Sequence, residues 1–267
     1  MLNLTKFNNK KYLIITGANG YLSQFFSKNL CVKYNLILWD IKFNQEFLKD
    51  IKNLAIENNT SIMSMNVDIT NQLKIKQSIK KLKSKRIEIY GLINCAGLNP
   101  QPNIQNPDYY KNYKSFINMW NKEINLSLKG YMLMIYEVSK ILQKSKSSAI
   151  INFSSDLGII SPNQNIYSKN SLKPLVYSVS KHGIIGMTKY FATLLSDKGI
   201  RVNSVCFGGV YNKKFDKNFI NKFSKLVPMD RMCNIEEILS PINFLLDNKN
   251  SYMTGHSLVV DGGRTIW

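Results

Sequence analysis

The residues best suited to acid–base chemistry are Tyr177 and Lys181, which lie four positions apart in the segment Tyr177-Ser178-Val179-Ser180-Lys181. On an α-helix, two side chains with this spacing lie one turn apart on the same face. A free tyrosine has a pKa of about 10, and a neighbouring ammonium group lowers that value by stabilising the tyrosinate. The pair could therefore give and take a proton. A solvated helix face is the alternative, because the chain is rich in Tyr and Lys.

A glycine-containing turn upstream could hold a pyrophosphate. The apolar run 11–16 predicts a buried strand, and Gly17 and Gly20 follow it before the apolar-periodic residues of a helix begin. Glycines between a strand and a helix let backbone amides approach a phosphate, which the helix N-terminus then stabilises. A tight turn without a ligand is the alternative interpretation.

Asp40 could bind another part of the same dinucleotide as the glycine-containing turn. It ends a second predicted strand, 36–40, at the distance from the glycines where an acid binds the ribose diol of NAD and repels the 2′-phosphate of NADP. Lys42 follows two residues later and would weaken that preference. We therefore expect NAD(H), with NADP(H) as the alternative cofactor.

The rest of the chain alternates strands and helices, which predicts the element order of a doubly wound fold. Further strands are expected at 62–67, 89–94, 149–153, 200–206 and 258–260, and helices at 71–84, 115–143, from Tyr177 to about 199, and 236–246. This pattern is typical of an α/β, single-domain, Rossmann-like fold: a mostly parallel seven-stranded sheet with helices on both faces. In such folds ligands bind at the carboxyl ends of the strands.

Several segments between these elements predict loops. Residues 98–114 and 161–173 are polar and rich in turn-forming residues, and 207–209 predicts a turn. Residues 213–226 predict a basic amphipathic segment, so that one domain, 1–267, would carry a small substrate lobe around 207–230. Gly183 and Gly186 are costly in an exposed helix, which predicts close packing against another helix or subunit.

Composition restricts the class of protein. A chain of 267 residues with 44% apolar residues can bury a full core. It has no run of about 18 apolar residues that could span a bilayer, and its first residues are too polar for a secretory signal, so we expect a cytoplasmic protein with no membrane partner. Four cysteines without paired spacing predict reduced thiols and no metal site.

The formal net charge of +19 raises the question of a nucleic-acid partner. The lysines are scattered among asparagines along the whole chain, and no arginine cluster or aromatic RNA-binding signature accompanies them. We therefore expect no nucleic-acid partner. The charge favours a polar or anionic small molecule.

Taken together, these features resemble the short-chain dehydrogenase/reductase family over nearly the whole chain. The stations in the family's order are the turn with Gly17 and Gly20, Asp40, Asp68, Asn94-Cys95-Ala96-Gly97, Asn125, Ser155, Tyr177 with Lys181, Arg201-Val202-Asn203, and Asp261-Gly262-Gly263. Each of these motifs alone is weak evidence for the family, but their order along one chain is specific to it.

The resemblance implies a catalytic tetrad. Tyr177 would be the general acid/base, and Lys181 would lower the pKa of Tyr177 and bind the nicotinamide ribose. Ser155 would hold the substrate oxygen, and Asn125 would keep a water in a proton relay to Lys181.

The resemblance also implies the cofactor-binding residues. Asp40 would bind the adenosine ribose, Asp68 the adenine, and Val210 with Asn212 the nicotinamide carboxamide. With Tyr177 and Lys181, the full set comprises Gly17, Asn19, Gly20, Tyr21, Leu22, Asp40, Asp68, Ile69, Asn94, Ala96, Gly97, Gly208, Val210 and Asn212. Tyr21 and Ser23 stand where the family usually has glycines, so Tyr21 could crowd the pyrophosphate. The segment between Ser155 and Tyr177 is also longer than usual.

The chain ending Asp261 to Trp267, with Lys173-Pro174 before Tyr177, is similar to a bacterial subgroup of flagellin-modification or surface-glycan oxidoreductases. This implies hydride transfer between nicotinamide and a secondary alcohol or ketone of a sugar or nucleotide-sugar derivative. Basic side chains near the predicted lobe suit an anionic ligand, or alternatively form a solvated face: Lys213, Lys214, Lys217, Lys222, Lys225 and Arg231. An acyl-carrier-protein ketoreductase and a catalytically weak cofactor-binding sensor or scaffold are the alternative functions. The family implies a homo-oligomer, a dimer or tetramer.

Overall fold

One seven-stranded sheet organises the chain. The computed structural model describes residues 11–98, 112–142, 148–168 and 171–267. Within these ranges the strand order is β3-β2-β1-β4-β5-β6-β7 and every pairing is parallel. The strands are β1 (Tyr12–Thr16), β2 (Asn35–Asp40), β3 (Ile62–Asn66), β4 (Ile89–Asn94), β5 (Ser148–Phe153), β6 (Ile200–Phe207) and β7 (Ser257–Val260). The predicted doubly wound sheet is confirmed, and it is entirely parallel.

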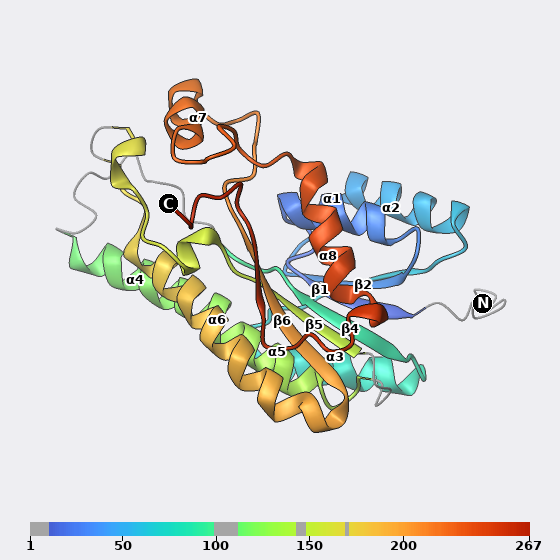
Figure 1. Cartoon of the computed structure of the whole chain (residues 1–267). Helices are drawn as coiled ribbons and strands as arrows, with labels where there is room; N and C mark the ends of the chain where they lie inside the picture. The colour runs from blue at the N-terminus through green and yellow to red at the C-terminus, as the bar shows by residue number, and fades with distance from the viewer. Residues whose placement is uncertain (1–10, 99–111, 143–147, 169–170) are drawn as a thin grey trace.

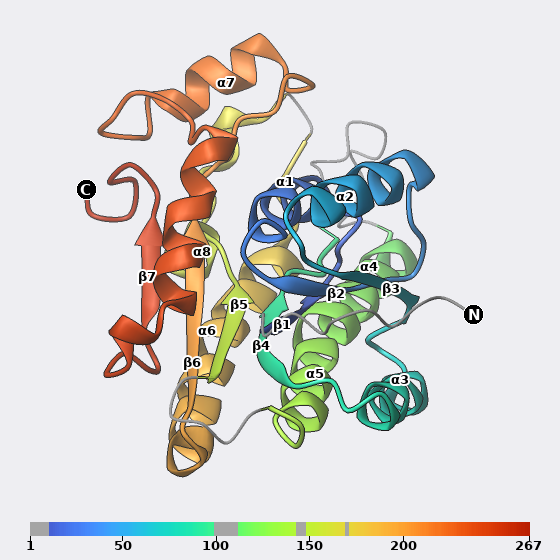
Figure 2. The ribbon, with the colours of Figure 1, turned by 90° about the vertical axis from the view of Figure 1, so that its right-hand side faces the viewer.

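Helices cover both faces of this sheet (Figures 1 and 2). On one face lie α1 (Tyr21–Leu30), α2 (Gln45–Glu57) and α8 (Leu239–Leu246). On the other lie α3 (Gln72–Ser84), α5 (Tyr131–Val138) and α6 (Leu175–Leu195), with α4 (Tyr113–Glu123) beside α6. A short helix, α7 (Lys217–Ser224), stands apart from both layers (Figure 1).

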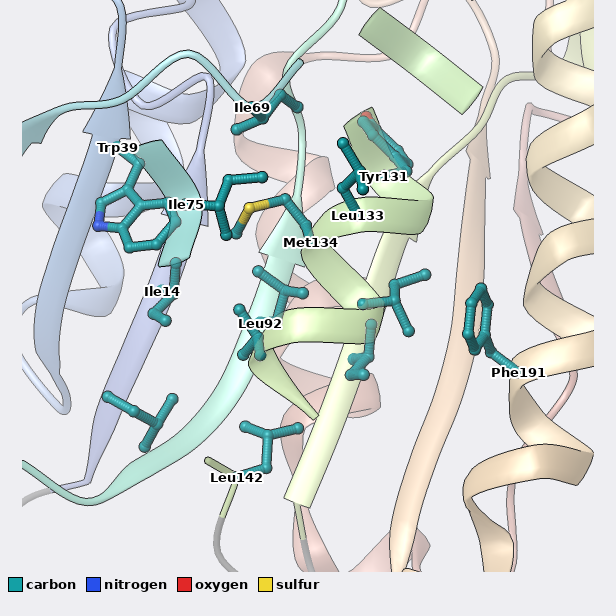
Figure 3. Packing of buried hydrophobic residues seen from close by; sticks show 14 of the residues in the cluster. Ile14, Trp39, Ile69, Ile75, Leu92, Tyr131, Leu133, Met134, Leu142 and Phe191 are labelled. Carbon is teal, nitrogen blue, oxygen red and sulfur yellow. The ribbon is translucent and has the colours of Figure 1, made fainter. Parts of the chain in front are cut away.

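The buried side chains form one cluster on each face of the sheet. Leu13 and Ile15 of β1 point to the α1, α2 and α8 side, whereas Ile14 between them points to the α3, α5 and α6 side. Figure 3 shows the second cluster, in which Trp39 and Ile75 lie close to Ile14. Because helices cover both faces, β1 and β4 are apolar over most of their length instead of alternating with polar residues.

The long helix expected over 115–143 is interrupted. It consists of α4, a π-helical segment Ile124–Gly130 and α5, which ends at Val138. The continuous helix to residue 143 is therefore wrong, and residue 143 itself lies outside the described ranges. Asn125 lies in the π-helical segment, where the helix is locally distorted. Such segments are rare and often mark functional sites.

Further boundaries also differ from the sequence-based expectation; the α-helix expected from Tyr177, for example, begins at Leu175. Residues 99–111 of the expected loop 98–114 lie outside the described ranges, and its last two residues belong to α4. Phe207 ends β6 instead of starting a turn. Residues 164–166 of the expected loop 161–173 form a short 3-10 helix.

The two glycines of α6 have different surroundings. A Cβ at Gly183 would lie 2.8 Å from Leu128, so its predicted close packing against another helix is confirmed. A Cβ at Gly186 would meet no atom within 4 Å in the described part of the chain. None of the helices in that part is long and apolar enough to cross a bilayer.

Candidate active site

A cleft of about 840 Å³ lies at the carboxyl ends of the central strands. Parallel strands all end at the same edge of the sheet, so residues that follow different strands meet there. The cleft brings together a large part of the predicted site: Gly20, Tyr21, Leu22, Gly97, Ser155, Tyr177, Lys181, Gly208, Val210 and Asn212.

The turn after β1 packs directly against the segment after β4. Gly17 has a φ of +65°, and a Cβ built on it would lie 2.5 Å from the Cα of Ala96. The hydroxyl of Thr16 accepts a hydrogen bond from the backbone amide of Cys95 at 3.2 Å. Gly17 and Ala96 therefore shape the floor of the turn.

Substituting Gly17 by alanine should disturb both features at once. The methyl group would have to displace backbone atoms of Ala96 and occupy a left-handed conformation that L side chains disfavour. We expect Gly17→Ala to lower the free energy of unfolding by about 1 to 3 kcal/mol, measured by urea denaturation. Gly186→Ala is the matched control, because a Cβ at Gly186 would meet no described atom within 4 Å. This substitution should be neutral or stabilising. Equal stability of the two variants would contradict this explanation.

The N-terminus of α1 is open to an anion. Its N-cap, Gly20, has no side chain that could accept from the first amides, and the first turn contains no acidic residue. Unpaired amides at a helix start favour a phosphate. Tyr21 is half exposed, and its hydroxyl donates a long hydrogen bond of 3.4 Å to the carbonyl of Tyr211 across the cleft. The residues present thus fit the pyrophosphate of a dinucleotide.

Backbone amides in and near this turn orient the carboxylate of Asp40. Its Oδ2 accepts a hydrogen bond from the amide of Asn19 at 2.9 Å, and its Oδ1 accepts one from the amide of Ile41 at 2.7 Å. The carboxylate is partly exposed, and each of its oxygens can accept a further hydrogen bond. This arrangement fits a carboxylate that accepts from a ribose diol.

Three other predicted cofactor residues lie at neighbouring strand ends. Asp68 is exposed, and its Oδ1 accepts from the amide and the hydroxyl of Thr70. Ile69 is buried in the core. Asn94 is fully buried, and its side chain donates to Asn152 at 2.9 Å. Asp68 and Ile69 follow β3 and Asn94 ends β4, and none of the three is among the residues that line the cleft.

Ser155, Tyr177 and Lys181 all line the cleft. Ser155 follows β5, and the other two lie one turn apart on α6. The Nζ of Lys181 lies 5.4 Å from the centroid of the Tyr177 ring and donates to the carbonyl of Phe153 at 3.2 Å. Since Phe153 ends β5, this hydrogen bond ties α6 to the strand that carries Ser155.

Burial dominates the ionisation of Tyr177. It raises the pKa of this tyrosine above its ordinary value; a hydrogen bond with Ser155 opposes the rise, and the charges of Asp156 and Glu123 add to it. Burial also lowers the pKa of Lys181, which the charge of Glu123 partly offsets. The expectation that Lys181 holds the pKa of Tyr177 low is therefore not met by the protein alone.

Asn125 is placed differently from the other members of the predicted tetrad. It is exposed in the π-helical segment, and of the described residues it is not among those that line the cleft. Its part in a proton relay stays a prediction.

Four buried charges near Tyr177 were missed by the sequence analysis. Asp156 and Arg264 form an ion pair in which both side chains are about 5% exposed, and Oδ1 of Asp156 accepts from the hydroxyl of Ser155 at 2.7 Å. The carboxylate of Glu123 is fully buried and accepts from the hydroxyls of Ser127 and Ser180.

The fourth buried charge is Lys173. Its Nζ lies 3.9 Å from the centroid of the Tyr177 ring, and the residue is 7% exposed. The position of Asp156 directly after Ser155 in the sequence could have indicated that it belongs to the site. Glu123 gives no such signal, because it resembles an ordinary surface charge in the sequence. Lys173 stood out in the sequence only as part of Lys173-Pro174.

The lobe around α7 presents aromatic rings to the cleft. Phe219 stacks on Tyr167 with ring centroids 5.7 Å apart and touches Phe215 edge-on, and all three line the cleft. Of the lysines considered for an anionic ligand, Lys214 lines the cleft, whereas Lys213, Lys217, Lys222 and Lys225 are exposed and lie outside the lining. Arg231 pairs with Glu237 at 2.7 Å. For most of these residues the solvated-face alternative is the better description.

An all-parallel sheet with this strand order, a helix start open to phosphate and a tyrosine–lysine pair at the strand ends define a nicotinamide-dependent oxidoreductase of the Rossmann type. Comparison with known proteins makes the class specific. A family model described as Enoyl-(Acyl carrier protein) reductase matches residues 33–265. The chain belongs to the short-chain dehydrogenase/reductase family, whose members are NAD(P)-dependent oxidoreductases.

Individual relatives cover nearly the whole chain. Post-translational flagellin modification protein A of Campylobacter coli is 28% identical over 95% of this chain and 97% of its own. The 3-oxoacyl-acyl-carrier-protein reductase FabG of Buchnera aphidicola subsp. Baizongia pistaciae is 30% identical, with the same two coverages. A short-chain dehydrogenase of Leptospira borgpetersenii, solved with bound NAD+, superposes with a TM-score of 0.80 at 27% identity, covering 96% of this chain and 93% of that one.

Proposed function

We propose that this protein transfers a hydride between NAD(H) and a secondary alcohol or ketone of a sugar or nucleotide-sugar derivative. The observation that carries the proposal is the convergence of Ser155, Tyr177 and Lys181 in one cleft with the open start of α1. The nicotinamide, when bound, supplies or accepts the hydride.

We assign the proton chemistry to Tyr177. Its hydroxyl would give the proton to, or take it from, the substrate oxygen, which Ser155 would hold by a hydrogen bond. Lys181 would bind the nicotinamide ribose. Because burial raises the pKa of Tyr177, the phenol is protonated at neutral pH and ready to donate.

We assign cofactor preference to Asp40, since a carboxylate at the ribose repels the 2′-phosphate of NADP. Asp40→Ser removes that charge, and we expect the preference for NADH over NADPH to fall at least about tenfold. The measurement is the ratio of the two dissociation constants by calorimetry. Lys42→Met is the companion variant, and we expect it to increase the preference for NADH. An unchanged ratio in Asp40→Ser would contradict the role of this carboxylate.

The sugar substrate is supported by the relation to the flagellin modification protein and by the polar side chains in the lining of the cleft, among them Ser155, Asp156 and Asn212. The experiment that tests it combines NADH and NADPH binding with a turnover screen of keto and hydroxyl sugars and sugar nucleotides. Turnover of a sugar derivative with NADH is the expected result. Turnover confined to acyl thioesters would contradict the substrate class.

Reduction of a 3-oxoacyl group on acyl carrier protein is the second candidate. The aromatic wall formed by Tyr167, Phe215 and Phe219 could contact an acyl chain, and FabG is among the relatives. This alternative predicts a preference for NADPH, so the cofactor titration separates the two. NADH binding without turnover of any compound would favour the third reading, a cofactor-binding sensor or scaffold.

We further propose a cytoplasmic homo-oligomer, with residues 207–230 as the substrate lobe of a single domain. Exposed apolar side chains on α5 and α6 support an interface there: Tyr136, Tyr190 and Leu194. Sedimentation analysis would test it, and a monomer at micromolar concentration would contradict it.

A further inference from the structure

Glu123, the last residue of α4, is a fully buried carboxylate that the chemistry assigned above does not use. Its Oε1 accepts hydrogen bonds from the hydroxyl of Ser127, in the π-helical segment, at 2.7 Å and from that of Ser180, on α6, at 2.8 Å. Its Oε2 accepts no hydrogen bond from any described residue. Burying a carboxylate is costly unless a cation compensates it, so a cation near Glu123 should interact with it strongly.

The contact with Ser180 holds this carboxylate against the reacting turn of α6. Ser180 directly precedes Lys181 and lies three residues after Tyr177, and its hydroxyl also lies 2.9 Å from the carbonyl of Tyr177. The π-helical segment and α6 pack closely here, since a Cβ at Gly183 would lie 2.8 Å from Leu128. The carboxylate is therefore fixed beside the turn that carries both reacting side chains.

Lys181 is the cation on this turn. It is 6% exposed, and its Nζ donates to the carbonyl of Phe153, a group without formal charge, at 3.2 Å. Burial lowers the pKa of Lys181, and the charge of Glu123 is the largest of the effects that raise it. The two charges attract each other through space, which favours the charged form of Lys181.

We propose that Glu123 is the counter-ion of Lys181, a positioning residue that keeps its ammonium group charged in the buried site. This rests on the proposed function, which assigns Lys181 to the nicotinamide ribose. A charged Lys181 has three protons to donate, one of which goes to Phe153. Its charge also stabilises the negative charge that develops on the oxygen of Tyr177 as the proton leaves. A neutral amine has fewer donors and lacks this second effect.

Other titratable groups act on Lys181 from the elements packed around it: Cys95 after β4, Cys206 on β6, Tyr177 on α6 and Lys173 before α6. Burial raises the pKa of both thiols and of the tyrosine, so all three are neutral at neutral pH. Asp156, whose charge acts on Tyr177, is paired with Arg264. Among these described groups, Glu123 is therefore the one whose negative charge can hold Lys181 in its charged form.

The substitution Glu123→Gln isolates this electrostatic effect, because the amide oxygen can still accept from both serines. In protein labelled with ¹³C at the ε-carbon of lysine, the NMR signal of Lys181, identified by its loss in Lys181→Met, follows the ionisation of the ammonium group. We expect this signal to titrate at lower pH in Glu123→Gln, since no charge then offsets the effect of burial on the pKa of Lys181. Glu123→Asp keeps the charge and should titrate closer to the unsubstituted protein, and it decides the question if Glu123→Gln does not fold.

A second buried carboxylate provides the matched control. Glu137 on α5 is 5% exposed, but it pairs with Lys140 at 2.9 Å and accepts from Gln72 of α3 at 3.0 Å. Glu137→Gln should leave the titration of Lys181 unchanged. An unchanged titration of Lys181 in Glu123→Gln, or the same shift in both variants, would overturn the proposal. Urea denaturation confirms that each variant is folded.

Turnover gives a second readout, which a purely structural role would not move. Reduction requires the ammonium of Lys181 and the phenol proton of Tyr177, so kcat with NADH should fall at alkaline pH. In Glu123→Gln this fall should begin at lower pH, because the charge of Glu123 raises the pKa of both groups. A kcat that is lowered equally at every pH would contradict the counter-ion role. No turnover of any compound by the unsubstituted protein, together with the expected NMR shift in Glu123→Gln, would contradict the proposed function and leave this inference standing.

Discussion

Tyr177→Phe should reduce turnover of any substrate by about 10²- to 10⁴-fold, the usual contribution of a general acid–base group. The substitution removes the hydroxyl that exchanges the proton and keeps the ring beside the ammonium groups of Lys173 and Lys181. The loss should therefore fall on kcat, while the dissociation constant for NADH changes little. Steady-state kinetics and calorimetry on the same preparation measure both quantities.

A second tyrosine of the cleft is the matched control. Tyr167 also lines the cleft, and burial raises its pKa to about 12, but it lies in the loop before α6 and stacks on Phe219. Tyr167→Phe should change kcat less than about tenfold. Turnover by Tyr177→Phe within tenfold of the unsubstituted enzyme would contradict the assigned role.

Arg264→Met should lower the free energy of unfolding by about 3 to 5 kcal/mol, because it leaves the buried carboxylate of Asp156 without its cation. Asp156 also accepts hydrogen bonds from the hydroxyl of Ser155 and the amide of Leu157. Loss of the pair should therefore also disturb the serine that is assigned to the substrate oxygen. Urea denaturation measures the stability change.

Two comparisons separate charge loss from a general packing defect. The double variant Asp156→Asn with Arg264→Met removes both charges and should recover much of the lost stability. Lys28→Met breaks the pair with Asp50, whose side chains are 37% and 47% exposed, and should cost at most about 1 kcal/mol. A cost for Arg264→Met no larger than that for Lys28→Met would show that the ion pair contributes little.

The positions of the strands along the chain were predictable because most of them are short apolar runs followed by a turn or a polar residue. Asp40 and Asn94 end their strands as expected, and the glycine turn follows β1. Parallel strands end at one edge of the sheet, so their terminal residues were expected to gather there. The expectation that Ser155 lies beside Tyr177 came from the resemblance to the family and not from local sequence patterns.

Burial of individual charges was not predictable from local patterns. Asp156 and Arg264 are far apart in the sequence and meet only because β5 and the segment after β7 end near the same cleft. Lys173 looks like the lysines of α7 in the sequence, yet it is buried and they are exposed. The rise in the pKa of Tyr177 has the same origin, since desolvation depends on the packed structure and not on spacing.

Hydride transfer can be followed directly with NADH that carries deuterium at C4 of the nicotinamide, using the most active carbonyl compound of the turnover screen. Mass spectrometry of the alcohol product should show deuterium on the former carbonyl carbon with the unsubstituted protein, and Tyr177→Phe should form at least about 10² times less labelled product in the same time while still binding NADH. No labelled alcohol from any compound despite bound NADH, or equal labelling by Tyr177→Phe, would contradict a tyrosine-dependent oxidoreductase.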